Sequence, residues 1–279
     1  MPELPEVETV ARLIRRPLQG RTVTGTRVRW PRTLGGTTPA AFGRAVRGAR
    51  VTHVGRRAKY VVIELEREGR FHGALLVHLR MTGRLHVVPA EEEPSPYERV
   101  ALDLDDGRRF VFQDVRKFGR FRFVKDPDEF LEDLGPEPLG EAFTAEWLRG
   151  ALRGRRRLLK PLLLDQTFVA GLGNIYVDES LHRSGLHPLT PSDRVGPKKA
   201  RRLWGEIRAT LEEAIEREGS SFDTFYRTPE GQPGSYQHQF RVYGRDGRPC
   251  RTCGRAIVKL VVGQRGTHVC TRCQPKPRG

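Results

Sequence analysis

Apolar residues at the start of the chain recur at the spacing of an α-helix. They are Leu4, Val7, Ala11 and Ile14, which would lie along one helical face. Pro5 suits a first helical turn, and the acidic residues around it complement the positive end of the helix dipole. The pattern therefore predicts a short amphipathic helix that begins almost at the N-terminus.

After this helix, the pattern changes to short runs rich in β-branched and aromatic residues. Residues 100–104 and 110–112 flank an Asp-Gly pair, which is typical of a β-hairpin turn. Residues 60–63 and 74–77 provide two more runs of this kind. The first half of the chain is therefore predicted to be a β-sandwich or barrel that carries one helix.

The second half begins with a turn-rich stretch at 126–142, whose Pro and Gly residues suit a linker between domains. Helical periodicity then resumes in four segments, which are 143–152, 158–165, 174–184 and 200–215. Residues 220–240 are rich in Ser, Gly, Pro and Tyr and indicate a mobile loop. This half is therefore predicted to be mainly helical.

Together these patterns predict an α+β protein of several domains. With 279 residues, of which 37% are hydrophobic, the chain can form one large domain or two ordinary ones. We predict a β-sandwich domain over 1–125, a linker over 126–142, a helical domain with its loop over 143–240, a cysteine-bearing module over 241–275 and a tail over 276–279.

The four cysteines lie close together near the C-terminus. Cys250 and Cys253 form one C-x2-C pair, and Cys270 and Cys273 form a second pair sixteen residues later. This spacing is typical of a zinc ribbon, in which two turns supply four sulfurs to one tetrahedral metal. Two structural disulfides are the alternative, but they are rare inside cells. We therefore predict one structural Zn²⁺.

The chain is strongly basic. It has 50 Lys and Arg residues against 34 Asp and Glu, for a formal charge of +16. A surplus of this size indicates a polyanionic partner such as nucleic acid, although a genome that favours Arg codons could also produce it. Clusters of basic residues at 153–157 and 198–202 favour binding.

The sequence contains no sign of a membrane or secretory segment. No apolar run approaches the ~18 residues that a membrane span needs. The first residues carry carboxylates where a signal peptide would carry positive charge. We therefore expect a folded, intracellular protein.

Pro2 is a candidate nucleophile. Removal of Met1, which a small second residue normally permits, would expose a secondary amine with a pKa of ~7.7–8.0. Such an amine can attack an aldehyde and form a cationic iminium, which acts as an electron sink. Glu3 and Glu6 stand near it and could serve as general acid or base, or could simply favour the start of the helix.

The opening residues 1–10 resemble those of formamidopyrimidine-DNA glycosylases, which are bacterial enzymes that excise oxidised purines. Seven further blocks resemble that family in the same order, at 57–60, 78–83, 114–119, 134–139, 160–165, 171–176 and 242–250. The resemblance covers essentially the whole chain. It implies a helix-two-turn-helix DNA-binding domain built around 158–165 and 174–184, followed by the zinc ribbon.

The resemblance also implies catalytic roles. Pro2 would be the Schiff-base nucleophile, and Glu3 would protonate the sugar as its ring opens. Lys59 would contact phosphate and assist β-elimination. Arg265, on the zinc hairpin, would hold the phosphate beside the lesion and assist δ-elimination.

The glycosidic bond of a stacked base lies inside the duplex. The damaged nucleotide must therefore be extruded before a chain-terminal amine can reach that bond. Met81, Arg116 and Phe118 resemble the residues with which the family holds open the gap in the duplex. We call them the wedge residues. Met81 would fill the vacated space, Phe118 would push between bases, and Arg116 would hydrogen-bond the orphaned base. Ordinary core packing is the alternative for Met81 and Phe118.

Other DNA contacts are expected in both halves of the chain. The two glycines before Asn174 would let the backbone approach an anion, and the Asn174 side chain suits an N-cap. By resemblance, Asn174 and His78 would contact phosphates together with Lys59 and Arg265. Lys160 would reach the lesion pocket, and Arg155 would meet the DNA backbone. A loop at 235–239 corresponds to the family's lesion-capping loop.

Three positions depart from the family's pattern. Val115 stands where Pro is expected, and Arg80 stands where Gly is expected. Tyr97 stands where some members have a DNA-contacting His, and we expect it to contact DNA. These departures concern the wedge geometry and the opposite-base preference, and they leave the catalytic assignment unchanged.

The expected function is therefore that of a bifunctional DNA glycosylase and abasic-site lyase for oxidised purines. An endonuclease VIII-like enzyme for oxidised pyrimidines is an alternative, although Leu4 argues against it because that branch more often has Gly there. A non-catalytic zinc-ribbon protein that binds damaged DNA is the alternative from another class. We expect a monomer that binds damaged double-stranded DNA in the bacterial cytoplasm, associated with the nucleoid.

Overall fold

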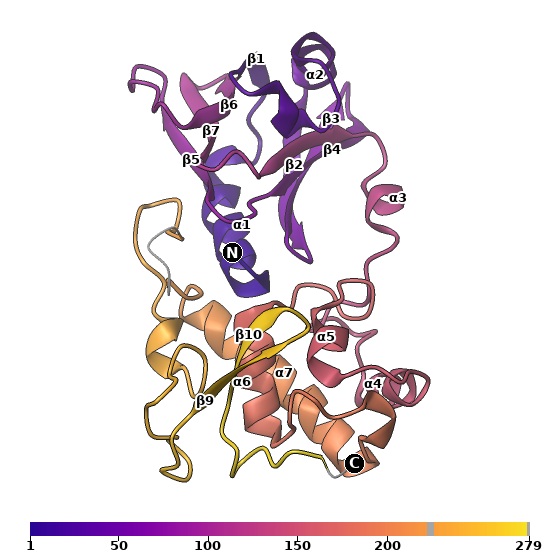
Figure 1. Ribbon diagram of the computed structural model, residues 1–279. Coiled ribbons are helices and arrows are strands. Elements are labelled where there is room, and N and C mark those ends of the chain that lie inside the picture. Colours follow the sequence, from indigo (N-terminus) through magenta and orange to yellow (C-terminus); the bar gives the residue numbers. More distant parts are fainter. Residues whose placement is uncertain (222–225, 278–279) are drawn as a thin grey trace. The chain divides into compact units, whose positions relative to one another are not determined.

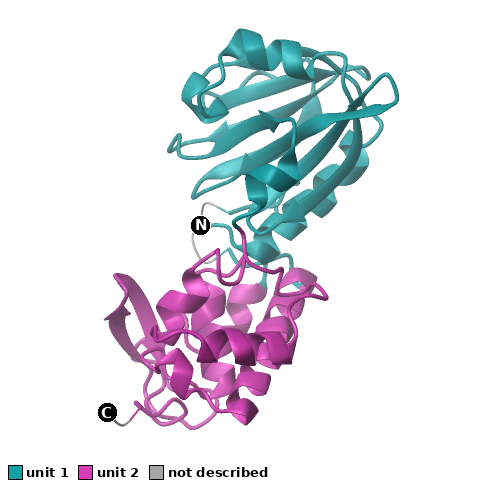
Figure 2. Cartoon of the chain, turned by 90° about the vertical axis from the view of Figure 1, so that its right-hand side faces the viewer, with its two compact units in different colours: residues 1–133, 217–235 teal, residues 134–216, 236–279 magenta. Residues whose placement is uncertain are grey.

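The computed structural model describes residues 1–221 and 226–277 (Figure 1). Residues 222–225 of the predicted loop and 278–279 of the predicted tail lie outside the described residues. The chain divides into two compact units (Figure 2). Unit 1 comprises residues 1–133 and 217–235, and unit 2 comprises 134–216 and 236–279.

Unit 1 contains two four-stranded antiparallel sheets. The strands are β1 (Val23–Val28), β2 (Arg50–Arg57), β3 (Tyr60–Arg67), β4 (Arg70–His78), β5 (Gly83–Pro89), β6 (Glu98–Leu104), β7 (Arg108–Asp114) and β8 (Arg120–Val124). One sheet has the order β2-β3-β4-β8, and the other has the order β1-β6-β7-β5. The predicted Asp-Gly hairpin is confirmed, since it joins β6 to β7 and Gly107 adopts a φ of +78°.

The predicted N-terminal helix is α1 (Leu4–Leu18), which contacts β2, β3 and β5 and so packs against both sheets. Its apolar face includes Val7 and Ile14, which share one buried cluster with Val61 of β3 and Phe112 of β7. Burial of this face is what holds the helix on the sheets. The fold class predicted for the first half is therefore confirmed.

The described part of unit 1 has three further short helical segments. They are η1 (Pro31–Leu34), α2 (Pro39–Val46) and α3 (Pro127–Leu131). The last of these lies inside the predicted linker. Asp126 caps it, because its Oδ1 accepts the backbone N–H groups of Asp128 and Glu129, each at 3.0 Å.

Unit 2 is mainly helical. Its helices are α4 (Ala145–Arg153), α5 (Leu159–Leu164), α6 (Asn174–Ser184), α7 (Pro197–Glu216), η2 (Ser192–Arg194) and η3 (Tyr236–Gln239). Two antiparallel strands follow, β9 (Val258–Val262) and β10 (Arg265–Val269). The helices expected near 143–152, 158–165, 174–184 and 200–215 are thus all present.

Residues 217–235 belong to unit 1, whereas the sequence pattern assigned most of them to the loop of the helical domain. The cause is a set of long-range hydrogen bonds. The Ser220 backbone N–H donates to Glu6 Oε1 at 2.8 Å, and the Pro229 carbonyl lies 3.1 Å from His86 Nδ1. Such contacts between distant segments leave no periodic signal in the sequence.

One local prediction is wrong. Asn174 is the first residue of α6, and Gly173 occupies the N-cap position. The Asn174 side chain instead donates its Nδ2–H to the carbonyl of Gly266 in β10, at 3.0 Å. Asn174 thus lies one position too far into the helix to be its N-cap, and its side chain makes this contact with β10 instead.

Among the described residues, none of the helices combines the length and the apolar character that a membrane crossing requires.

Candidate functional site

The N-terminus of unit 1 holds the predicted nucleophile and its acid. Pro2 and Glu3 are both buried, and Glu3 is the N-cap of α1. The Glu3 backbone N–H donates to Glu6 Oε2 at 2.8 Å, so the Glu6 carboxylate supports the backbone next to Pro2. Met1 precedes Pro2 in the sequence, and removal of Met1 would turn the Pro2 nitrogen into the chain terminus.

Glu6 connects two segments of unit 1 that are far apart in the sequence. Its Oε2 supports Glu3, and its Oε1 accepts the backbone N–H and the hydroxyl of Ser220, at 2.8 and 3.2 Å. Gly219, with a φ of +77°, lies so close that a side chain there would come within 2.8 Å of Glu6. The contact of Glu6 with Ser220 could not be read from the sequence, because the two residues are 214 positions apart.

Lys59 and His78 are positioned by adjacent strands of one sheet. Lys59 follows Ala58, whose φ of +51° makes the tight turn between β2 and β3. His78 ends β4 opposite Tyr60, and the two rings meet edge to face at 4.8 Å. Both Lys59 and His78 are buried.

The His78 ring is held neutral. Burial lowers its pKa, and the charges of Arg80 and Lys59 lower it further, to about 3. The Nδ1 atom accepts the Arg80 backbone N–H at 3.1 Å, so the proton of the neutral ring lies on Nε2. His78 therefore presents a hydrogen-bond donor, which is the group that a phosphate oxygen accepts from.

This lowered pKa predicts a pH-dependent stability. Below about pH 6.5 the unfolded state protonates His78, but the folded state does not until about pH 3. The unfolded state then binds more protons, so the free energy of unfolding falls as the pH falls through this range. Denaturant titrations at pH 7 and 4.5 should show a smaller loss of stability in His78→Gln than in the wild type. If His78→Gln lost as much stability between pH 7 and 4.5 as the wild type, the lowered pKa of His78 would be contradicted.

The three wedge residues lie together on two loops of unit 1. Arg116 Nη1 is 3.1 Å from Met81 Sδ, and its guanidinium carbon is 4.9 Å from the centre of the Phe118 ring. Phe118 is 49% exposed, and Met81 is only partly buried. Core packing therefore does not explain these side chains. Tyr97, 47% exposed, accepts the Asp114 N–H through its carbonyl at 2.9 Å, beside the same loop.

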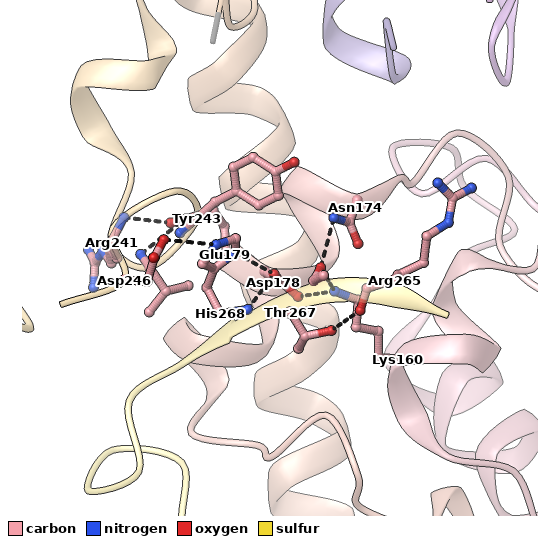
Figure 3. Close-up of polar contacts among 12 residues, drawn as sticks. Lys160, Asn174, Asp178, Glu179, Arg241, Tyr243, Asp246, Arg265, Thr267 and His268 are labelled. Atoms are coloured by element: carbon pink, nitrogen blue, oxygen red, sulfur yellow. Dashed lines mark hydrogen bonds and ion pairs between the residues drawn. The ribbon is translucent and has the colours of Figure 1, made fainter. Parts of the chain in front are cut away.

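In unit 2, Arg265 begins β10 and is exposed. The next carbonyl, that of Gly266, accepts hydrogen bonds from Lys160 Nζ and Asn174 Nδ2, each at 3.0 Å (Figure 3). These two donors from α5 and α6 fix the backbone of the hairpin that carries Arg265.

Lys160, which was expected to reach the lesion pocket, is buried beneath the hairpin. Its side chain is 0% exposed, and Nζ forms a 2.7 Å ion pair with the equally buried Asp178. An ammonium group buried in this way is costly to move away from its carboxylate. Its place in the structure favours support of the hairpin over direct contact with DNA. Arg155, in contrast, is exposed after α4.

Sequence reasoning missed two buried carboxylates on α6. Asp178 Oδ2 accepts the His268 N–H at 2.9 Å, and Glu179 accepts three consecutive backbone N–H groups, from residues 241–243, at 2.9 to 3.0 Å (Figure 3). Burial raises the pKa of Glu179, and the three N–H groups oppose this shift. The pair attaches α6 to both sides of the cysteine module. The signal that could have revealed them is the pair of adjacent acidic residues, Asp178 and Glu179, within the predicted helix.

The four cysteine sulfurs form one cluster, within 4.8 Å of one another. The Cys253 and Cys270 sulfurs are 3.4 Å apart, and those of Cys250 and Cys273 are 3.9 Å apart. A disulfide would need about 2.05 Å, whereas thiolates around one tetrahedral zinc are about 3.8 Å apart. The donor set therefore fits one structural Zn²⁺, as predicted.

Three sequence-family models match the chain. The formamidopyrimidine-DNA glycosylase N-terminal domain matches residues 1–121, the H2TH domain of the same enzymes matches 134–226, and a zinc finger found in FPG and IleRS matches 247–276.

Complete relatives agree with these matches. A formamidopyrimidine-DNA glycosylase of Chloroflexus aurantiacus is 44% identical, with 98% of each chain covered. The crystal structure of the MutM (FPG) protein from Thermus thermophilus has a TM-score of 0.87 and 41% identity, covering 99% of this chain and 100% of that one.

A Lactococcus lactis FPG mutant in complex with DNA containing Fapy-dG has a TM-score of 0.90 and 33% identity, with 99% of this chain and 100% of that chain covered. These matches extend over both units and the cysteine module. This chain belongs to the formamidopyrimidine-DNA glycosylase family.

Proposed function

We propose that this protein is a bifunctional DNA glycosylase and abasic-site lyase that removes oxidised purines, such as 8-oxoguanine and formamidopyrimidines, in base excision repair. The observation that carries the proposal is the agreement with glycosylases over the whole chain. It includes a relative crystallised with DNA that contains Fapy-dG. The buried Pro2-Glu3 start of α1 supports the same chemistry.

The reaction begins when the Pro2 nitrogen, freed by removal of Met1, attacks C1′ of the damaged nucleotide. The bond from C1′ to the base breaks, and the base leaves with the bonding electrons and takes up a proton. Glu3 protonates the sugar oxygen as the ring opens, which leaves an iminium between Pro2 and C1′. This cation then drives the two eliminations, which break the C3′–O and C5′–O bonds in turn.

The cations and hydrogen-bond donors of both units bind the phosphates. In this proposal Lys59 assists the first elimination and Arg265 the second. His78 donates its Nε2–H, and Asn174 and Arg155 add contacts to the backbone. Lys160 acts by supporting Arg265 through the Gly266 carbonyl.

The wedge residues hold the duplex open while the lesion is extruded. Met81 replaces the extruded base, Phe118 enters the stack, and Arg116 hydrogen-bonds the orphaned base. Tyr97 lies beside them at an exposed position that suits a DNA contact. One structural Zn²⁺ holds the hairpin of β9 and β10 in the fold that presents Arg265.

The protein acts as a monomer on damaged double-stranded DNA, in the bacterial cytoplasm and in association with the nucleoid. The bacterial origin of its relatives supports this location. A formal charge of +16 suits a partner that carries a phosphate at every nucleotide.

The test of the substrate class compares two duplexes, one with 8-oxoguanine opposite cytosine and one with thymine glycol opposite adenine. We expect faster excision from the first. Preferential cleavage of the second would support the endonuclease VIII-like alternative. Tight binding to both duplexes without any strand cleavage would support the non-catalytic alternative.

A further inference from the structure

Asp114 is a buried carboxylate that the proposed chemistry does not use. It ends β7 and is 1% exposed. Its Oδ1 accepts the Thr82 hydroxyl and, at 3.2 Å, the Arg116 backbone N–H. Its Oδ2 accepts the Gly119 N–H at 2.7 Å. One carboxylate thus binds the loop after β4 and both sides of the loop between β7 and β8.

Thr82 makes the connection between the two loops. It directly follows Met81 and is buried. Its Oγ1 donates to Asp114 and at the same time accepts the Arg116 N–H at 3.1 Å. The backbone that carries Arg116 is therefore joined to the backbone that carries Met81 by a closed set of three hydrogen bonds.

The end of the loop between β7 and β8 that leads into β8 is also held in place. A side chain at Gly119 would clash with the Phe112 ring and lie 3.1 Å from Asp114 Oδ2, so only glycine lets its N–H reach the carboxylate. The Gly119 carbonyl accepts the Thr33 hydroxyl at 2.9 Å, and Arg99 Nε donates to the Asp114 carbonyl at 2.8 Å. The anchor below the exposed loop is rigid.

Both loops hold backbone conformations that need such an anchor. Arg80 has a φ of +54° and Lys117 a φ of +61°, in the left-handed region that costs about 1 kcal/mol or more for a residue other than glycine. Each of these residues adjoins a wedge residue. Release of the buried hydrogen bonds would let both loops relax away from this arrangement.

We infer that Asp114 and Thr82 are positioning residues that hold the three wedge side chains in one arrangement and so set the preference for the base opposite the lesion. The inference rests on the proposed function. Arg116, which would meet that opposite base, is hydrogen-bonded through its backbone to both residues. Its guanidinium can select between bases only if that backbone stays in place, because hydrogen-bond selectivity depends on donor direction.

The test uses Thr82→Val, which keeps the shape of the side chain and removes only the hydroxyl. Single-turnover excision of 8-oxoguanine is measured opposite cytosine and opposite adenine. We expect the ratio of the two rates to fall by about tenfold, the scale of one lost hydrogen bond to a charged group. The fluorescence change of 2-aminopurine placed opposite a stable abasic analogue should fall in parallel.

Two variants separate positioning from general loss of stability. Thr82→Ser retains the hydroxyl and should restore the wild-type ratio. Thr52→Val removes a hydroxyl that donates to the Glu64 carbonyl at 3.3 Å elsewhere in unit 1, and it should leave the ratio unchanged. Asp114→Asn, which weakens all three bonds to the carboxylate, should lower the ratio at least as much as Thr82→Val.

The inference is overturned if Thr82→Val retains the wild-type ratio and fluorescence change, or if Thr52→Val alters them equally. Wild-type protein that neither excises 8-oxoguanine nor forms a covalent complex with abasic DNA would instead contradict the proposed function. The two failures are therefore distinguishable in one set of measurements.

Discussion

Replacement of Pro2 by Gly should reduce the covalent complex that borohydride traps with abasic DNA by about two orders of magnitude or more, as expected when a nucleophile is replaced. A secondary amine gives an iminium that is cationic without further protonation, whereas the primary amine of Gly gives an imine that must first gain a proton. Glycine also loosens the backbone that enters α1 next to Glu3. The complex is measured as slowly migrating protein-DNA adduct after reduction.

Two variants control this experiment. Pro5→Ala alters the other proline at the start of α1 and should leave trapping intact, since the Pro5 nitrogen is not terminal. Glu3→Gln should still trap preformed abasic DNA but excise 8-oxoguanine slowly, because only the glycosylase step needs its proton. N-terminal sequencing establishes that Met1 has been removed. A Pro2→Gly sample that is trapped as fast as the wild type would exclude Pro2 as the nucleophile.

Loss of the zinc site should weaken DNA binding by about a hundredfold, because folding of such a module and metal binding are coupled. Among the described residues, the buried cluster around the cysteines is small: it contains Val242, Cys250, Ile257 and Cys270, with Cys253 and Cys273 packed against it. Without the metal this cluster cannot hold β9 and β10, and Arg265 loses its fixed position. Cys270→Ser, whose parent thiol is fully buried, is the sharpest variant.

The measurement compares metal content, by mass spectrometry, with the dissociation constant for a duplex containing a stable abasic analogue at one salt concentration. Thr252→Ser, between Cys250 and Cys253, is the matched control and should keep both values. The core of unit 1 is separate from this cluster, so its β-rich circular dichroism should survive. If a zinc-free Cys270→Ser protein bound DNA with unchanged affinity, the metal would have no role in DNA binding.

Several elements could be predicted because their signals are local. The face of α1, the hairpin between β6 and β7, and the helix α6 each follow from periodicity or turn residues within a few positions. The zinc site was predictable for the same reason. Each C-x2-C pair directs two sulfurs toward one metal through its short spacing, and the four sulfurs lie within 4.8 Å of one another.

The partners of buried polar groups could not be predicted in this way. Glu6 binds Ser220, which is 214 positions away, and Lys160 binds Gly266, which is 106 positions away. Asn174 looked like a helix cap but is bound to β10. Each of these side chains has a plausible local role, and only the folded chain shows which partner it meets.

The order of the main elements and the four metal ligands followed from the sequence, because these depend on residue type and short spacing, and the sequence also named the candidate catalytic groups. The fold decided which hydrogen-bond and ion-pair partners the buried polar side chains meet, as it does for Asp114 and Lys160. The physical reason is that a buried charge needs a partner, and that partner is chosen by packing across the whole fold.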